Sequence, residues 1–158
     1  MVHRAFGTAD YWLARLAVCP VDVATLESLR GGGESGTEGT IEVVTVQSML
    51  SKNLPALVTQ LHRGDLCVRR EERWGPVVDG TATAVIAGAI VDAPVSLSGT
   101  AVLSPIAGSG GARLTYRVSI QVRVPIIGGK IEKIIGTQLI DLVNAEQRFT
   151  TTWVTKTA

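Results

Sequence analysis

One acidic residue interrupts an apolar stripe near the C-terminal end of the chain. Glu146 lies between Leu142 and Phe149, at a spacing that a helix would place on one face. An ionised carboxylate on such a face is costly unless it has a partner. We therefore predict that Glu146 points into the interior and contacts a ligand hydroxyl, a water molecule or a basic side chain. The alternative is that it lies at the rim of the fold and reaches solvent.

A second pair of charges has the parity of a buried strand face. Arg70 and Glu72 share this parity with three apolar neighbours, and alternate residues of a strand lie on the same face. These neighbours are Leu66, Val68 and Trp74. If both charged side chains point inward, they could orient the polar head group of a ligand. A twist or bulge that turns both outward is the competing interpretation, and the sequence leaves the two open.

Large apolar side chains complete the predicted ligand-binding site. Aromatic residues suit the walls of a cavity, although each belongs more often to a plain core. The aromatic candidates are Trp74, Tyr116, Phe149 and Trp153. The aliphatic candidates are Ile86, Leu97, Val118, Leu139 and Leu142. With Arg70, Glu72 and Glu146 they form the predicted ligand-binding set, in which no residue is assigned a catalytic role.

Other residues that carry chemistry lack the spacing that catalysis or metal binding requires. His3 and His62 are isolated, and only Asp65 follows His62 closely, so no third metal ligand is suitably placed. The serines lack the Gly-x-Ser-x-Gly pattern of a nucleophile elbow. Cys19 and Cys67 lie far apart and indicate free thiols in a reducing compartment. We therefore predict no metal and no cofactor.

Composition and charge indicate one globular domain, residues 1–158. The 158 residues are 46% hydrophobic, which is enough to bury a core without metal or disulfide support. The 15 basic and 14 acidic side chains give a net charge of +1. Because no basic stripe is interleaved with aromatic residues, nucleic-acid binding is disfavoured.

Neither a targeting signal nor a membrane span is predicted. Residues 1–6 carry charge, but no apolar segment of signal-peptide type follows them. The most apolar run, residues 82–91, is too short and too interrupted by glycine to span a bilayer. We therefore predict a cytoplasmic protein without integral membrane association.

The candidate residues must be positioned by a β-rich chain and one long terminal helix. Short helices are predicted at residues 2–6 and after Thr8, which is a plausible cap, whereas residues 21–30 are ambiguous between helix and strand. A Gly-rich loop at 31–36 lacks the Lys-Ser/Thr ending of a phosphate-binding loop. Strands are predicted at 40–49, 65–74, 81–91, 95–105 and 112–125, with a helical turn or bulged crossing at 54–61. After residue 129 a helical period continues for about 26 residues, or about 39 Å.

Short connections predict an antiparallel meander with one dry face and one wet face. The last strand alternates cleanly, with apolar residues at even positions from Leu114 to Val124. Small residues recur on the dry face, namely Ala82, Ala84, Gly88, Gly99 and Ala101. They leave room between the sheet and the helix, which large neighbours fill or which remains a pocket of about 300–1,000 Å³.

Several motifs along nearly the whole chain carry a resemblance to a known group. They are Asp10-Tyr11-Trp12, Thr45-Val46-Gln47-Ser48, Gly64-Asp65-Leu66, Trp74-Gly75-Pro76, Leu97-Ser98-Gly99-Thr100 and the segment from Pro125 to Glu132. With the short helices, meander and terminal helix, they resemble the START-like (SRPBCC, helix-grip) superfamily. More closely, the chain is similar to an actinobacterial domain of unknown function within it.

The resemblance implies an α+β fold in which a curved antiparallel sheet of seven strands grips the last helix around a cavity for an apolar ligand. It also implies that residues 26–30 form the second strand. The family opens with a strand before the first helix, whereas this sequence starts within that helix. Either the assigned start omits the strand, or this version folds without it. An open sheet edge could then pair with a second copy of the chain and form a homodimer.

Three functions remain in competition. The first is a carrier or sensor of a small apolar molecule, such as a lipid, polyketide or isoprenoid. The second is an enzyme of the cyclase or dehydratase kind that uses Glu146 or Tyr116 as acid or base. The third is an interaction module whose interior is filled by its own side chains.

The charge of Glu146 leads to two further expectations. Burial should raise the pKa of its carboxyl group unless Arg70 or another cation compensates. Replacing Glu146 with leucine should leave stability unchanged or higher, because the substitution completes the apolar stripe.

Overall fold

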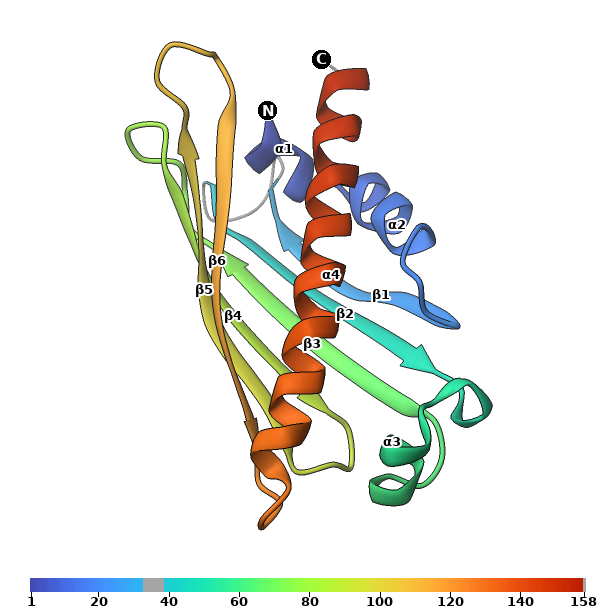
Figure 1. The fold of residues 1–158 in the computed structure, drawn as a ribbon. Helices are drawn as coiled ribbons and strands as arrows, with labels where there is room; N and C mark the ends of the chain where they lie inside the picture. The colour runs from blue at the N-terminus through green and yellow to red at the C-terminus, as the bar shows by residue number, and fades with distance from the viewer. Residues whose placement is uncertain (33–38, 158) are drawn as a thin grey trace.

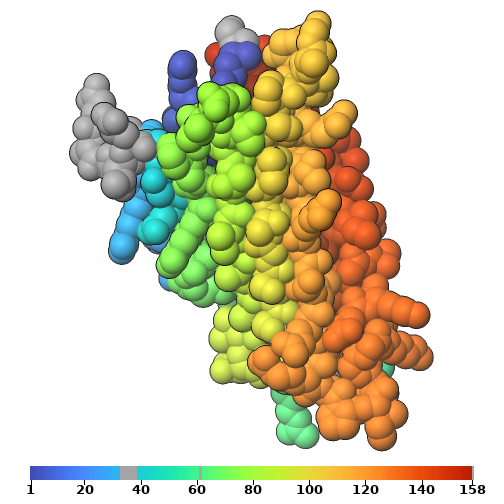
Figure 2. Space-filling model, turned by 90° about the vertical axis from the view of Figure 1, so that its left-hand side faces the viewer, coloured from blue at the N-terminus to red at the C-terminus, as the bar shows by residue number. Residues whose placement is uncertain are grey.

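The computed structural model describes residues 1–32 and 39–157, so residues 33–36 of the predicted Gly-rich loop lie outside the described part. Six strands form one antiparallel sheet whose spatial order follows the chain. They are β1 (Val23–Gly31), β2 (Ile41–Met49), β3 (Leu66–Trp74), β4 (Ala82–Ile90), β5 (Val95–Pro105) and β6 (Ala112–Val122). The expected meander is therefore confirmed, and Figure 2 shows the successive strands as neighbouring bands of colour.

The helices lie on one face and at one end of the curved, open sheet (Figure 1). They are α1 (Val2–Phe6), α2 (Ala9–Ala17), α3 (Ala56–Leu61) and α4 (Gly128–Lys156), with a short 3₁₀ turn at Ser51–Asn53. The 29 residues of α4 confirm the long terminal helix and run along the inner face of the sheet. The architecture is therefore α+β, as expected.

Helix α4 follows the edge strand β6 along its length. The Glu132 side chain accepts a hydrogen bond from the Val122 backbone N–H (3.0 Å), and Gln147 donates one to the Leu114 carbonyl (3.2 Å). These two contacts fix the start and the later part of the helix against opposite ends of the same strand. The strand and the helix therefore form one unit, which carries Glu146 over the middle of the sheet.

Three local expectations are corrected or resolved. The last strand ends at Val122 instead of Pro125, because Val122 lies opposite Val95, where β5 begins, and Pro94 has no N–H to extend the ladder. The chain then turns at Ile126, whose φ is 71°. Thr8 precedes α2, but its hydroxyl donates to the Ala5 carbonyl (2.8 Å) and does not cap α2. The ambiguous segment 21–30 contains β1, in accord with the strand that the resemblance implies.

The sheet of the described residues has six strands, whereas the resemblance implies seven. The strand that the resemblance places before the first helix is not among them. β1 and β6 form the two edges of this sheet. Pairing of an edge with a second copy stays a prediction.

The core occupies one half of the concave face. Its fully buried rings are Phe6, Tyr11, Trp12 and Trp74, which pack in tilted or edge-to-face contacts with centroids 5.0–5.9 Å apart. Ala84 and Ala101 are buried in the same cluster and provide room for the rings. In this half, the space left by small residues is therefore filled by large neighbours.

At position 99 a small residue is required for a different reason. A Cβ atom at this position would lie 2.1 Å from the Arg117 carbonyl oxygen of the adjacent strand β6. No atom can occupy that distance without moving the backbone. Gly99 therefore permits the close approach of β5 and β6, and it does not enlarge a cavity as the sequence suggested.

We expect Gly99→Ala to destabilise the protein by about 1–3 kcal/mol, the range for an overpacked interior. The matched control is Gly129→Ala, in the first turn of α4, where an added Cβ meets nothing within 4 Å. That change should be neutral or stabilising, because alanine favours a helix over glycine by about 1 kcal/mol. Urea denaturation of both variants checks the contrast, and equal stabilities would contradict it.

Candidate functional site

Four charged side chains from three elements meet beneath α4. Arg15 comes from α2, Arg70 and Glu72 come from β3, and Glu146 comes from α4. All four are buried, and Glu146 is only 6% exposed. We call these four residues the buried charge cluster.

Each glutamate in the cluster contacts both arginines. Arg70 binds Glu146 with both terminal nitrogens, at 2.7 Å to Oε1 and 3.3 Å to Oε2. Arg15 Nη2 lies 3.1 Å from Glu146 Oε2 and 3.3 Å from Glu72 Oε1. Arg70 Nε lies 3.4 Å from Glu72 Oε1. Two positive and two negative charges therefore balance within one buried network.

Local sequence patterns explain how these side chains meet. On α2, Arg15 follows Tyr11 by four residues and Trp12 by three, so all three lie on the buried face of the helix. On β3, Arg70 and Glu72 alternate with exposed or half-buried neighbours and face the concave side. The guanidinium of Arg15 stacks over the Trp12 ring at 4.3 Å, which adds a cation–π contact.

Neutral donors and acceptors support the cluster. Trp74 donates its indole N–H to Glu72 Oε2 (3.1 Å). Thr150 donates its hydroxyl to the Glu146 carbonyl (2.8 Å) and lies 2.7 Å from the Tyr11 hydroxyl. Because the single hydroxyl proton of Thr150 is used in this way, the Tyr11 hydroxyl donates to Thr150. This network joins α2 to α4 beside the charges.

Two nitrogens in the cluster have no hydrogen-bond partner among the described residues. They are Nε of Arg15 and Nε of Arg70, and both are buried. Arg70 Nε still lies close to a Glu72 oxygen, whereas Arg15 lines a very small, partly open space next to Cys19 and Glu146. That space measures about 10 Å³, roughly the room for one water molecule.

The electrostatic balance keeps Glu146 ionised. Burial alone would raise the pKa of its carboxyl group, but the nearby guanidinium groups of Arg15 and Arg70 outweigh burial and lower it. Burial raises the pKa of the Tyr116 hydroxyl well above its usual value, and the Glu72 carboxylate adds to this increase. The expectation of compensation by a cation is therefore met, with Arg15 as a second, unexpected partner.

Several predictions about these charges can now be settled. Glu146 and the Arg70–Glu72 pair do point inward, so the rim and outward alternatives are wrong. Arg15 was not among the predicted site residues, although it is a charge on the same face of a predicted helix as Tyr11 and Trp12. The pattern that identified Glu146, a charge on an apolar helix face, also marks Arg15.

The structure separates the remaining predicted site residues into three groups. Trp74 and Ile86 are fully enclosed in the core. A second group, partly buried, packs against that core: Leu97, Tyr116, Phe149 and Trp153. The third group, Val118, Leu139 and Leu142, is half-buried. Whether any of these residues binds a ligand stays a prediction.

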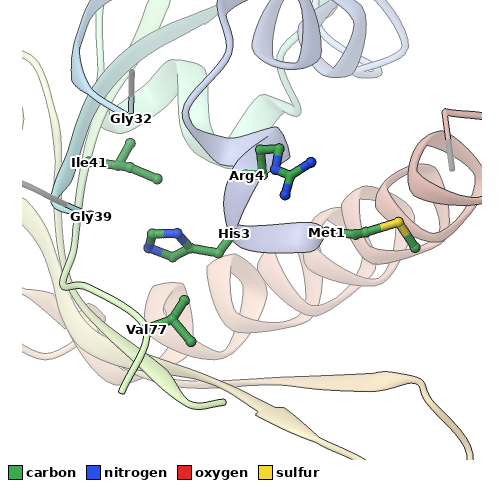
Figure 3. A pocket seen from close by; sticks show the side chains of 7 residues that line it. All are labelled: Met1, His3, Arg4, Gly32, Gly39, Ile41 and Val77. Atoms are coloured by element: carbon green, nitrogen blue, oxygen red, sulfur yellow. The ribbon is translucent and has the colours of Figure 1, made fainter. Parts of the chain in front are cut away.

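One hollow among the described residues lies away from the position that the sequence suggested. It measures about 340 Å³ and is lined at the end of the molecule nearest the N-terminus by Met1, His3, Arg4, Gly32, Gly39, Ile41 and Val77 (Figure 3). Its position beside α1 separates it from the residues predicted to bind a ligand. This hollow is therefore not the interior pocket that was predicted between the sheet and α4.

Apolar residues in the other half of the concave face remain only half-buried. On β4 and β5, inward-facing residues are buried near Trp74 but become half-buried toward the start of α4. We define the half-buried apolar surface by its members: Leu66, Val68, Ile90, Val95, Leu97, Val118 and Ile120 from the sheet, and Ile131, Ile135, Leu139 and Leu142 from α4. These side chains lie between the buried charge cluster and the β6–α4 loop.

Metal-binding and redox groups add little to this site. Within residues 1–32 and 39–157, no group of three or more His, Cys, Asp or Glu side chains could hold a metal ion. Both cysteines are free thiols, and Cys19 accepts a hydrogen bond from Gln47 at 2.9 Å.

Among the described helices, none has the length and apolar character needed to cross a membrane.

The cluster contradicts the expectation for leucine at position 146. Glu146→Leu would leave Arg15 and Arg70 facing Glu72 alone, so we now expect a loss of about 3–5 kcal/mol, the cost of breaking a buried ion pair. The matched control is Glu27→Leu. Glu27 pairs with Arg69 at the surface, so its replacement should lower the stability by at most about 1 kcal/mol. Chemical denaturation of both variants measures the difference, and similar losses would show that the cluster is not a structural unit.

The lowered pKa of Glu146 also predicts how stability depends on pH. Its contribution is complete above the ordinary carboxyl value of 4.5 and is lost as pH falls through the lower value of the folded state. The difference in melting temperature between the parent and Glu146→Gln should therefore be largest near neutral pH and shrink in acid. Melting curves at a series of pH values test this expectation, and a constant difference would contradict it.

One family model and three relatives match nearly the whole chain. A family model described as "Protein of unknown function (DUF2505)" matches residues 1–154. Uncharacterized proteins of Mycobacterium bovis and of two strains of Mycobacterium tuberculosis are each 72% identical over 154 residues. Each match covers 98% of this chain and 88% of the relative. The chain therefore belongs to the DUF2505 family.

Proposed function

We propose that this protein binds and carries a small apolar ligand against the half-buried apolar surface. One observation carries the proposal: inward-facing aliphatic side chains of the sheet and of α4 stay partly exposed over half the concave face. Burial of apolar area is favourable by about 25 cal/mol per Å². A ligand that covers these side chains would gain this energy without displacing the packed core.

The arrangement of the two faces supports a ligand between them. Gly136 of α4 lies close to Ile120, since a Cβ at Gly136 would be 3.9 Å from Ile120 Cδ1. The helix therefore approaches the sheet at β6, whereas Leu66 and Val68 lie three strands away on β3. Apolar walls from two elements that meet at one side suit an elongated or ring-shaped hydrocarbon.

The buried charge cluster sets one end of the proposed site. Leu142 precedes Glu146 by one helical turn, and Val68 precedes Arg70 on the same strand face. Because the four charges neutralise one another, the cluster offers little attraction to a ligand with a net charge. An uncharged lipid, polyketide or isoprenoid is therefore a better match than a fatty acid.

The same electrostatics weigh against the enzyme alternative. Glu146 is held as a carboxylate by two guanidinium groups, so it is a poor proton donor and a weakened base. The raised pKa of Tyr116 makes its hydroxyl a poor acid as well. A cyclase or dehydratase would need at least one such group tuned toward neutral pH.

The sequence resemblance adds an analogy to this physical argument. The START-like superfamily places apolar ligands between a curved sheet and its last helix, which is the location proposed here. Fold analogy alone is weak evidence of function.

The interaction module remains the main competing function, because the protein's own aromatic side chains fill the half of the concave face that holds the core. A cytoplasmic location also remains a prediction.

Adjacent residues of α4 provide a sharp test. Leu139 belongs to the half-buried apolar surface, whereas Ile140 is 63% exposed and lies outside it. We expect Leu139→Asn to weaken binding of the neutral fluorescent probe N-phenyl-1-naphthylamine by about tenfold, because one apolar side chain is lost from the site. Ile140→Asn should leave the affinity unchanged.

Titrations of the probe with the parent and both variants decide the matter. Competition by a long-chain alcohol, and weaker competition by the acid of equal length, would support an uncharged ligand. No binding by the parent, or equal effects of the two substitutions, would favour the interaction module. A native mass spectrum of the protein from its own host would then show whether an apolar molecule accompanies it.

A further inference from the structure

The loop between β6 and α4 carries an unusually placed isoleucine. Ile126 is 104% exposed, so its side chain makes almost no contact with the rest of the protein. Its φ of 71° is left-handed, a genuine outlier for a β-branched residue. Glycine would adopt this conformation without strain. The isoleucine thus costs folding energy and brings no packing in return.

The position of the loop makes this side chain prominent. The loop forms the lower tip of the molecule in Figure 1, at the opposite end from both chain ends of the described residues. The turn between β4 and β5 lies beside it, since the Arg123 N–H donates to the Pro94 carbonyl (2.8 Å). That turn contributes Val91, which is also an exposed apolar side chain. The tip therefore presents apolar groups on two adjacent segments.

Basic side chains outnumber acidic ones near the apolar tip. Arg123, Lys130 and Lys133 are exposed, and none of them forms an ion pair within the described part of the chain. Of the acidic groups nearby, Glu132 is bound to the Val122 N–H, and Asp92 is exposed in the neighbouring turn. Three cations against two carboxylates leave the tip with a net positive charge.

We infer that this tip docks on the surface of a lipid bilayer that contains anionic lipids. An apolar side chain can enter the boundary between head groups and acyl chains, while the surrounding cations contact anionic head groups. A protein partner fits less well, because a narrow projecting tip lacks the broad surface of about 1,000 Å² that a stable interface needs. The docking is peripheral and requires no membrane-spanning segment.

The inference is independent of ligand binding, although the two are compatible. The half-buried apolar surface extends toward the start of α4, so a docked molecule would hold this end close to the bilayer. A carrier could exchange an apolar ligand there. Vesicle binding can nevertheless be measured without any ligand, so failure of one proposal does not decide the other.

The test uses vesicles of phosphatidylglycerol and phosphatidylcholine, with pure phosphatidylcholine vesicles for comparison. The parent should cosediment with the anionic vesicles and be released as salt is raised. Ile126→Gly should weaken this binding by about tenfold or more, the effect of losing one inserted isoleucine side chain. Its melting temperature should equal or exceed that of the parent, because the left-handed strain is relieved.

A matched control is available at the other end of the molecule. Ile106 is an exposed isoleucine in the turn between β5 and β6, and Ile106→Gly should bind vesicles like the parent. The proposal is overturned if the parent does not bind anionic vesicles, or if Ile126→Gly binds as tightly as the parent. It is also overturned if Ile126→Gly changes the sedimentation of the protein alone, since the tip would then be a contact between copies.

Discussion

Four buried charges must balance one another for the helices to pack on this sheet. Arg15, Arg70, Glu72 and Glu146 are removed from water together, and each would be costly there alone. Their contacts hold α2, β3 and α4 in one arrangement. Hydrophobic packing could tolerate small shifts of these elements. The ion pairs of the cluster, with distances between 2.7 and 3.4 Å, cannot tolerate such shifts. The cluster therefore specifies how the helices lie on the sheet.

The cluster also divides the concave face into two unlike halves. On one side, Phe6, Trp12 and Trp74 fill the space above Ala84 and Ala101 and form a closed core. On the other side, the aliphatic residues of β3 to β6 and of the first half of α4 remain partly exposed. The short helices explain the asymmetry, because α1 and α2 cover only the end of the sheet near the chain termini (Figure 1). The stable core and the proposed binding surface therefore lie in different regions.

The architecture and three of the four members of the buried charge cluster could be predicted from the sequence. Alternation on β6, the helical period after Gly129 and short connections are local properties, and they predicted the meander and the long helix. Glu146, Arg70 and Glu72 were recognisable because a charge on an apolar face needs a partner. The end of β6 was misplaced, because the strand ends where its partner β5 begins at Val95, and Pro94 has no N–H to extend the ladder.

Periodicity along a strand or helix fixes the face of each residue, so the inward-facing side chains could be predicted from the sequence alone. The contacts of each inward residue became known only from the folded structure. It joined Glu146 to two arginines, 76 residues away in the case of Arg70, and so lowered the pKa of a carboxyl group that burial alone would raise. It also showed that Gly99 serves the approach of two strands. The physical reason is that partners distant in the chain are set by how the elements pack, and local periodicity carries no information about that packing.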